Sequence, residues 1–249
     1  MVVDDVAVRA TRRARPGVRG ELPGRPGNAG RSWSDRLGLM DLNRRIMDLV
    51  LGSIAFLVSL PILAAVAVWM HLSGDRGSFL YRARRVGAGG TTIDVLKIRT
   101  MREGAQGAGL TSTDDPRVTT VGRAIRRYRI DELPQLVNVV VGEMSLVGPR
   151  PEDPRYVDFG DPLHRRVFGV RPGITGPTQL QYRDEATLLA GSDDPDRLYR
   201  EEILPAKLRM DAEYLDRRTI GSDLGILWQT VRVLLPGSVG RGVDPGADG

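Results

Sequence analysis

Two adjacent acidic residues, Asp131 and Glu132, follow a stretch with three arginines at residues 126–129. Together they could perform phosphoryl transfer, which needs positioning, charge neutralisation and a nucleophile in line with the leaving group. The Asp131 carboxylate could attack phosphorus and form an aspartyl-phosphate type of intermediate. Glu132 could hold Mg²⁺, a hard cation that prefers oxygen ligands and phosphate. The plainer alternative is that the two acids cap a helix and complement its dipole.

Several cations are spaced to meet a diphosphate beside this pair. Arg126 lies just before the predicted helix start, where backbone N–H groups and a guanidinium can hold phosphate together. Lys97 and Arg99 occupy one face of a predicted strand, because side chains alternate along a strand. A solvated edge strand that carries charge against aggregation would have the same pattern.

Two later arginines lie in turns that proline stiffens. Arg150 stands between Pro149 and Pro151, which fix the backbone and reduce the entropy lost when a ligand binds. Arg171 begins the run Arg-Pro-Gly-Ile-Thr-Gly, which again places a cation on a loop that proline constrains. Taken singly, either turn could be an ordinary loop with a surface arginine.

Composition narrows the chemistry further. The chain of 249 residues has no cysteine and only two histidines, His71 and His164. Disulfides, thiolate metal sites, thiol nucleophiles and a histidine-rich metal centre are therefore excluded. The carboxylates and cations supply the parts for phosphoryl transfer without histidine or cysteine.

Positive charge is concentrated at the start of the chain. Residues 1–45 hold ten arginines and five acidic residues, and this difference of five equals the net charge of the whole chain, +5. Residues 1–35 lack apolar periodicity, which predicts a disordered arm suited to an anionic membrane surface. Nucleic acid is a competing partner, but no recognised nucleic-acid fold follows the arm, so we expect membrane lipids and no nucleic acid.

An uncharged apolar run extends from Leu49 through Gly74. As one helix it would be about 40 Å long against a hydrocarbon core of about 30 Å, so a single transmembrane span is the plain interpretation. Pro61 near its middle should break the helix, with Ser59 placed to bond a freed carbonyl. Arginines flank both ends, and the positive-inside rule then favours a kinked, re-entrant hairpin with both flanks in the cytoplasm.

The remaining elements follow from periodicity. Extended runs at residues 78–86 and 91–100, joined by Gly-Ala-Gly-Gly, predict a β-hairpin. Helices are expected over residues 131–141, with Gly142 as the stop, over 194–218 with a bend at Pro205, and over 222–235. The last helix is amphipathic and could pack in a core or lie in a membrane interface.

These elements predict an α+β fold: a membrane-inserted re-entrant helix and a compact, mostly helical cytoplasmic domain with a small β-hairpin. The expected division is a disordered Arg-rich arm over 1–35, the re-entrant helix over 36–75, the catalytic domain over 76–235 and a disordered tail over 236–249.

The ordered motifs resemble those of the bacterial sugar transferases, the monotopic polyprenyl-phosphate phosphoglycosyl transferases. The resemblance covers about Arg44 to Leu235. It is carried by the motifs Lys97-Ile98-Arg99-Thr100-Met101, Asp131-Glu132-Leu133-Pro134-Gln135-Leu136, Gly142-Glu143-Met144-Ser145-Leu146-Val147-Gly148-Pro149-Arg150-Pro151-Glu152 and Arg171-Pro172-Gly173-Ile174-Thr175-Gly176.

The resemblance implies a re-entrant membrane helix at the inner (plasma) membrane, with the catalytic domain on the cytoplasmic face. It implies that Asp131 forms a covalent sugar-phosphate intermediate from a UDP-sugar and releases UMP. Polyprenyl (undecaprenyl) phosphate then takes the sugar phosphate, which initiates assembly of an exopolysaccharide or another glycoconjugate. Glu132 would bind Mg²⁺, and Arg126 and Arg150 match substrate-contact positions of the family; Lys97, Arg99 and Arg171 match motif positions.

The chain departs from the family pattern at two places and so does not name its sugar. Tyr128-Arg129 replaces the small hydroxyl residues that many members carry, and residues 177–185 differ from the commoner Gln-Val-Asn-Gly pattern. The alternatives are a non-catalytic membrane adaptor in polysaccharide assembly and a nucleic-acid binder that uses the arm. The chain could also form a homo-oligomer, which the sequence does not define.

Overall fold

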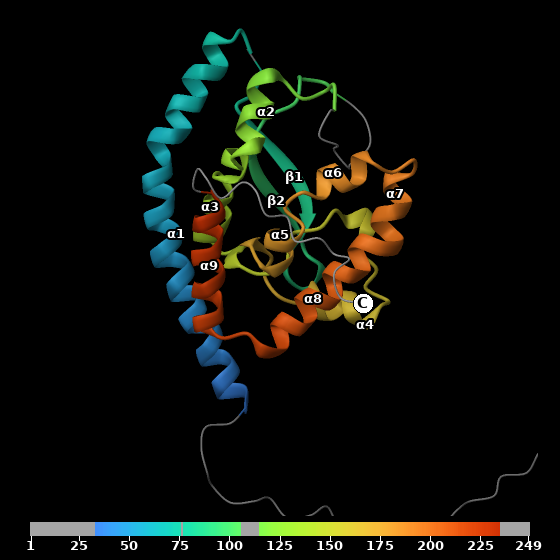
Figure 1. The fold of residues 1–249 in the computed structure, drawn as a ribbon. Helices are drawn as coiled ribbons and strands as arrows, with labels where there is room; N and C mark the ends of the chain where they lie inside the picture. Colours follow the sequence, from blue (N-terminus) through green and yellow to red (C-terminus); the bar gives the residue numbers. More distant parts are fainter. Residues whose placement is uncertain (1–32, 76, 106–114, 235–249) are drawn as a thin grey trace, which may run out of the picture.

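The computed structural model describes residues 33–75, 77–105 and 115–234 (Figure 1). The predicted N-terminal arm falls outside this range except at its end, where the first helix begins at Trp33. The predicted tail over 236–249 lies wholly outside the described residues.

The long helix α1, Trp33–Leu72, runs along one side of the molecule without interruption (Figure 1). It continues through Pro61, so the chain does not double back there as the hairpin interpretation expected. Proline removes one N–H group, and the helix keeps its other hydrogen bonds. The Ser59 hydroxyl donates to the carbonyl of Phe56 at 2.7 Å, one residue before the Leu57 carbonyl that Pro61 leaves unpaired.

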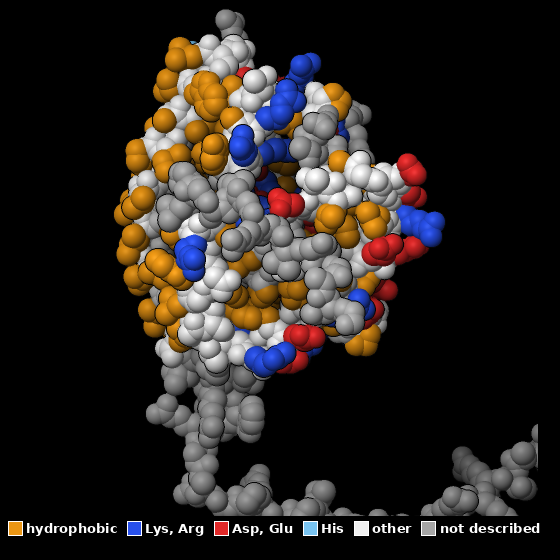
Figure 2. All heavy atoms as spheres, in the orientation of Figure 1, with side chains coloured by type: hydrophobic (Ala, Val, Ile, Leu, Met, Phe, Trp, Pro, Cys, Tyr) orange, Lys and Arg blue, Asp and Glu red, His pale blue; other side chains and the backbone are white. Residues whose placement is uncertain are grey.

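The two faces of α1 differ in character. Its inner face packs on the rest of the fold: Ala55 and Phe56 contact a core that includes Val139, and Met70 contacts a second core around Ile125. The outer face is apolar and exposed, as the left edge of Figure 2 shows. Its large exposed residues include Leu42, Ile46, Leu49, Val50, Ile54, Leu57, Val58, Val68, Trp69 and Leu72.

Within the described residues, one helical stretch, Asp41–Leu72, is long and apolar enough to cross a membrane. Its 32 residues span about 48 Å. This helix is consistent with a membrane-associated protein.

The predicted hairpin is confirmed. Strands β1, Leu80–Val86, and β2, Thr92–Ile98, pair antiparallel around the short turn η1, Ala88–Gly90. The inward side chains of Ala83 and Val95 are fully buried. The hairpin therefore has one core face.

The segment that carries the acidic pair differs from the prediction of one helix over 131–141. Helix α2, Thr120–Arg127, leads into a single 3₁₀ turn, η2, Ile130–Glu132, and α3 begins only at Gln135 and ends at Val141. Pro134 is the N-cap of α3, because it can start a helix but cannot supply an interior N–H. The predicted stop is confirmed, since Gly142 adopts a left-handed conformation with φ of 96°.

A second sheet was not predicted. Strands β3, Ser145–Val147, and β4, Gly173–Thr175, pair in parallel beneath the Arg150 turn. The backbones approach so closely that a Cβ atom on Gly173 would lie 2.1 Å from the Gly148 nitrogen. Glycine is thus required where these two motifs meet.

Further helices and turns complete the domain (Figure 1). They are η3 Pro154–Tyr156, α4 Pro162–Val167, α5 Pro177–Gln181, α6 Glu185–Ala190, α7 Pro195–Leu198, the π turn η4 Tyr199–Ile203, α8 Leu204–Arg217 and α9 Ile220–Leu234. The predicted long helix over 194–218 is therefore three consecutive helical segments, with the π turn just before Pro205. The fold is mixed helix and sheet and mostly helical, as predicted.

Candidate active site

A cavity of about 1040 Å³ opens between the β1–β2 hairpin, the α2–η2 segment and the helices opposite α1. Figure 2 shows lysine and arginine side chains around a hollow in this face. The predicted site residues that line the cavity are Lys97, Arg99, Arg126, Asp131, Glu132, Arg150 and Pro151. Two predicted residues do not line it: Pro149 is buried behind the turn, and Arg171 is exposed outside the cavity.

The turn η2 presents the acidic pair to the cavity. Arg129 precedes it with φ of 53°, the one non-glycine residue with positive φ in the described chain. This left-handed residue bends the backbone, and the Glu132 N–H then donates to the Arg129 carbonyl at 3.1 Å. Left-handed backbone at a non-glycine residue is uncommon and occurs where the surroundings enforce it. The carboxylates are thereby held on a fixed turn.

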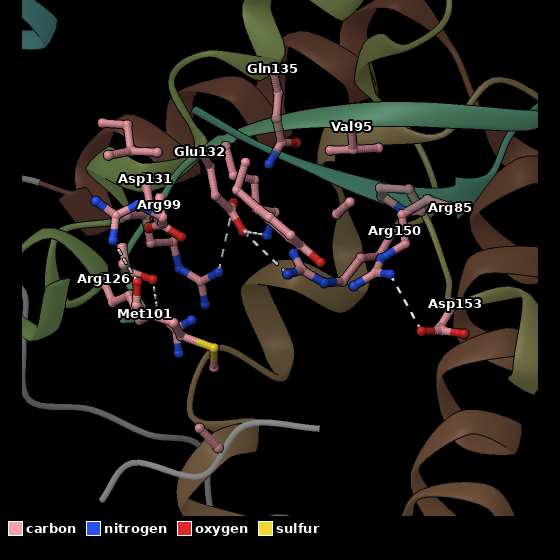
Figure 3. Close-up of a pocket in the computed structure, with 18 of the residues that line it drawn as sticks. Arg85, Val95, Arg99, Met101, Arg126, Asp131, Glu132, Gln135, Arg150 and Asp153 are labelled. Atoms are coloured by element: carbon pink, nitrogen blue, oxygen red, sulfur yellow. Dashed lines mark hydrogen bonds and ion pairs between the residues drawn. The ribbon is translucent and has the colours of Figure 1, made fainter. Parts of the chain in front are cut away.

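Glu132 is clamped by cations. Its Oε1 accepts from Lys97 Nζ at 3.3 Å and from Arg150 at 3.2 Å, and Arg129 lies 4.0 Å from Oε2 (Figure 3). Burial alone would raise the pKa of Glu132, but the positive charges of Lys97, Arg150 and Arg129 hold it well below its usual range. Glu132 is therefore ionised throughout the physiological range.

Asp131 has the opposite environment. Among the described residues, no side chain or backbone group forms a hydrogen bond or ion pair with its carboxylate. Burial and the negative charge of Glu132 raise its pKa, and the nearby Lys97 and Arg126 only partly offset them. A carboxylate of raised pKa with no fixed partner is available to react.

The cations differ in how much of their hydrogen-bonding capacity remains. Arg126 donates Nε to Thr100 Oγ1 at 2.7 Å, which directs its guanidinium beside Asp131 (Figure 3). Arg99 is already occupied, because it donates to Asp75 and to the carbonyls of Ser78 and Met101. Arg99 thus ties the hairpin to the chain after α1, whereas Arg126 retains N–H groups for a ligand.

Several lining residues were missed by sequence reasoning. They are Arg85, Gln135, Glu152, Gln179, Glu185, Tyr199 and Lys207. Lys207 is buried in the first turn of α8, and in the sequence it looks like any helical lysine. The one sequence signal for Lys207 was its place at the edge of an apolar helical stripe, and this signal does not show which side chain the lysine contacts.

The carboxylates can be tested against the Mg²⁺ that the resemblance implies. No group of three histidine or acidic side chains within the described residues could hold a metal ion. Among the described residues, Glu132 Oε2 has only the Arg129 contact at 4.0 Å, and Glu132 lines the cavity. Mg²⁺ is commonly held by one or two carboxylates together with substrate phosphates and water. The residues therefore fit Mg²⁺ that arrives with a diphosphate.

Comparison with known proteins agrees with these motifs. The family model described as bacterial sugar transferase matches residues 39–237. A UDP-glucose:undecaprenyl-phosphate glucose-1-phosphate transferase of Caulobacter vibrioides is 35% identical over 201 residues, which cover 79% of this chain and 71% of the relative. An Aeromonas hydrophila UDP-N-acetylgalactosamine-undecaprenyl-phosphate N-acetylgalactosaminephosphotransferase is 35% identical over 78% of this chain and 44% of its own length.

An Escherichia coli UDP-glucose:undecaprenyl-phosphate glucose-1-phosphate transferase is 34% identical over 78% of this chain and 40% of its own length. The chain thus spans less than half of two of these relatives. The match still includes α1, the acidic pair and the Arg150 turn. The chain therefore belongs to the bacterial sugar transferase family and is an enzyme of the phosphoglycosyl transferase class.

Proposed function

We propose that the enzyme transfers a sugar-1-phosphate from a UDP-sugar to undecaprenyl phosphate. The observation that carries the proposal is the contrast between an unpaired Asp131 and a cation-clamped Glu132 in one cavity. A structural helix cap would have its carboxylate bonded to backbone N–H groups. The names of the relatives supply the donor and acceptor classes.

The cations around the pair suit a diphosphate. Lys97, Arg126 and Arg150 line the cavity. Figure 3 shows Arg126 beside Asp131 and Arg150 on the other side of Glu132. Phosphoryl-transfer enzymes work chiefly by placing such charges against the equatorial oxygens. Mg²⁺ bound through Glu132 would neutralise further charge on the diphosphate.

Asp131 then acts as the nucleophile. Its carboxylate oxygen forms a bond to the phosphorus that carries the sugar, and the bond from that phosphorus to the bridging oxygen breaks, so UMP leaves. An oxygen of undecaprenyl phosphate next attacks the same phosphorus and releases the Asp131 carboxylate. Each displacement conserves the phosphoryl group and needs no oxidant.

The outer face of α1 would hold the enzyme at the membrane. Because α1 contacts the domain near both Phe56 and Met70, the polar domain lies beside the helix over much of its length. A helix crossing the bilayer would draw this domain into hydrocarbon, where polar groups are costly. We therefore place both ends of α1 on the cytoplasmic side of the plasma membrane, with its apolar face in lipid.

Purified protein with undecaprenyl phosphate, Mg²⁺ and a panel of UDP-sugars tests the reaction. At least one donor should release UMP, chelation with EDTA should stop the release, and added Mg²⁺ should restore it. Donor labelled in the sugar phosphate should leave label on the wild-type protein when the acceptor is omitted. A protein that releases no UMP from any donor would support the adaptor alternative.

Topology has a separate test. The chain lacks cysteine, so Asp41→Cys and Ser78→Cys each introduce a single thiol, one near each end of α1. A membrane-impermeant maleimide should label both from the cytoplasmic side of inverted vesicles. Labelling from opposite sides would show that α1 spans the membrane.

A further inference from the structure

A chain of polar side chains lies behind the Arg150 turn and does not enter the proposed displacement steps. Lys207 Nζ contacts Glu185 Oε2 at 2.8 Å and the Tyr199 hydroxyl at 3.3 Å, and that hydroxyl donates to Glu152 Oε2 at 2.5 Å. All four residues line the active-site cavity. They join α6, the π turn η4 and α8 to the residue that follows Pro151.

These four polar residues give the cavity two unlike sides. Figure 3 shows Asp131 and Arg126 on one side of Glu132, and Arg150 and Asp153 on the other. The side beyond Arg150 adds acidic and hydroxyl groups, because Glu152, Glu185 and Tyr199 lie there. The cations on that side are paired, Arg85 with Asp153 at 3.4 Å and Lys207 with Glu185 at 2.8 Å. The cations next to the acidic pair therefore suit phosphate, whereas the side beyond Arg150 adds carboxylate and hydroxyl groups.

The two glutamates among these four residues, Glu152 and Glu185, are not equivalent. Glu152 uses both oxygens, since Oε1 accepts from the Asp153 N–H at 2.9 Å and Oε2 from Tyr199. Glu185 uses Oε2 for Lys207, and no group among the described residues contacts its Oε1. Its side chain is 23% exposed, while that of Lys207 is only 5% exposed. Lys207 thus fixes a carboxylate that still has a free oxygen at the cavity wall.

We propose that Glu185 binds adjacent hydroxyl groups of a neutral ring of the donor substrate, and that Lys207 is the residue that positions it. The inference rests on the proposed function and deepens it. A carboxylate repels phosphate but accepts strongly from hydroxyls, and charge-assisted hydrogen bonds are about twice as strong as neutral ones. With the diphosphate held by the cations around the acidic pair, the part of the donor beyond Arg150 is a polyhydroxyl ring.

Two parts of the donor have this chemistry: the transferred sugar and the ribose. Inhibition by UMP separates them, because UMP contains the ribose and lacks the sugar. If Glu185 binds the sugar, Glu185→Gln and Glu185→Ala should raise the KM for the donor and leave the Ki of UMP unchanged. If it binds the ribose, both constants should rise by the same factor.

The expected effect is a rise in donor KM of about tenfold for Glu185→Gln and more for Glu185→Ala, with kcat changed less than twofold. Asp184→Asn is the matched control, since Asp184 is the adjacent carboxylate and its side chain is 70% exposed. It should leave both constants as in the wild type. Lys207→Met should raise donor KM, and adding it to Glu185→Gln should have little further effect.

Calorimetry of donor binding and thermal melting complete the test. Glu185→Gln keeps an oxygen that can accept from Lys207 and should melt close to the wild type, which separates recognition from folding. Glu185→Ala leaves the buried Lys207 charge without its partner and should melt lower, so its constants are compared per folded molecule. If Lys207→Met or Glu185→Ala does not fold, Glu185→Gln still decides. Donor KM, UMP Ki and donor Kd all within twofold of the wild type would overturn the inference. So would a fall in kcat with KM unchanged. A wild-type protein that binds no UDP-sugar would instead overturn the proposed function, and this inference with it.

Discussion

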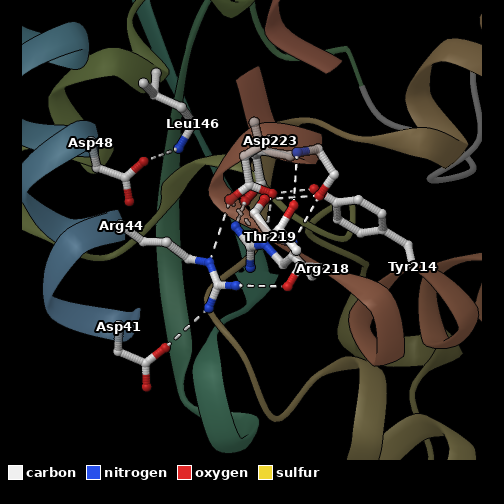
Figure 4. A network of polar contacts seen from close by, with 10 residues as sticks. Asp41, Arg44, Asp48, Leu146, Tyr214, Arg218, Thr219 and Asp223 are labelled. Atoms are coloured by element: carbon white, nitrogen blue, oxygen red, sulfur yellow. Dashed lines mark hydrogen bonds and ion pairs between the residues drawn. The ribbon is translucent and has the colours of Figure 1, made fainter. Parts of the chain in front are cut away.

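Two of the buried clusters of arginine and carboxylate among the described residues differ in what is left unpaired. The first joins α1 to the α8–α9 corner: the Asp223 carboxylate, 0% exposed, meets Arg218 at 2.9 Å and Arg44 at 3.4 Å and also accepts from the Tyr214 hydroxyl (Figure 4). The second surrounds Asp131 and Glu132 in the cavity. Only the second holds a carboxylate without a partner among the described residues.

The Asp223 cluster uses its cations internally. Arg218 also donates to the Val147 carbonyl at 2.7 Å, and Arg44 donates to the Arg218 carbonyl at 3.2 Å. Nearby, Arg45 donates to the carbonyls of Val139 and Val140 in the last turn of α3. Internal pairing indicates a structural joint, and charge left over at a cavity indicates a ligand site. Residue types alone do not separate the two.

The largest expected effect is on the unpaired carboxylate. Asp131→Asn should lower turnover by at least about 10³-fold, because an amide cannot replace the nucleophile. It should also abolish the labelled adduct and leave melting at neutral pH equal or slightly higher. The direction of the change in stability follows from the raised pKa of Asp131. The native state favours the protonated carboxyl group, and the stability that this protonation contributes is lost as pH rises through the pKa of Asp131 in the folded state. Near-normal UMP release by this variant would refute the nucleophile assignment.

The Asp223 cluster should respond in stability instead. Asp223→Ala leaves the Arg218 and Arg44 charges without their buried partner, and breaking such a pair costs about 3–5 kcal/mol. Chemical denaturation should show the loss, whereas UMP release per folded molecule should stay near the wild-type value. An Asp223→Ala protein of normal stability with reduced turnover would reverse the roles given to the two clusters.

The cations of the cavity should affect donor binding. Arg126→Gln removes a guanidinium that faces the diphosphate position, and hydrogen bonds to charged groups contribute about 1.5–3 kcal/mol, or roughly ten- to a hundredfold in donor KM. The control is Arg123→Gln, an exposed arginine on the same helix α2, which should leave KM unchanged. Equal effects from both variants would mean that overall charge, and not the cavity, attracts the donor.

Local pattern predicted much of this arrangement. Alternation and glycines located the β1–β2 hairpin, and the apolar stripe of the last helix predicted α9, because both signals depend on near neighbours in sequence. The parallel pairing of Ser145 with Gly173 joins segments far apart in the chain and left no local signal. The predicted break at Ser59–Pro61 was wrong, since α1 continues through Pro61, which costs the helix one backbone hydrogen bond.

The sequence predicted which residues form the site but not which side chains contact one another there. The motifs named Asp131, Glu132 and Arg150, and the structure brings them to one cavity. Arg99 forms an ion pair with Asp75, and Lys207 forms one with Glu185. Both pairs join side chains from different elements, so the sequence alone did not predict them. Arg44 and Arg45 were read as membrane-flanking charges, yet both bind the catalytic domain.

The smallest expected effect is a shift in a pH profile, and it sharpens the contrast within the acidic pair itself. Glu132→Gln removes the negative charge that, after burial, does most to raise the pKa of Asp131. It also frees Lys97 and Arg150, which then act on Asp131 with the same sign. The pKa of Asp131 should therefore fall, and the acid limb of the residual rate of UMP release should move to lower pH. The rate itself will drop because Glu132 is the proposed Mg²⁺ ligand, so the profile is compared by shape at saturating Mg²⁺. A limb that moved to higher pH would show that Glu132 helps Asp131 to ionise, the reverse of the coupling argued from the cavity.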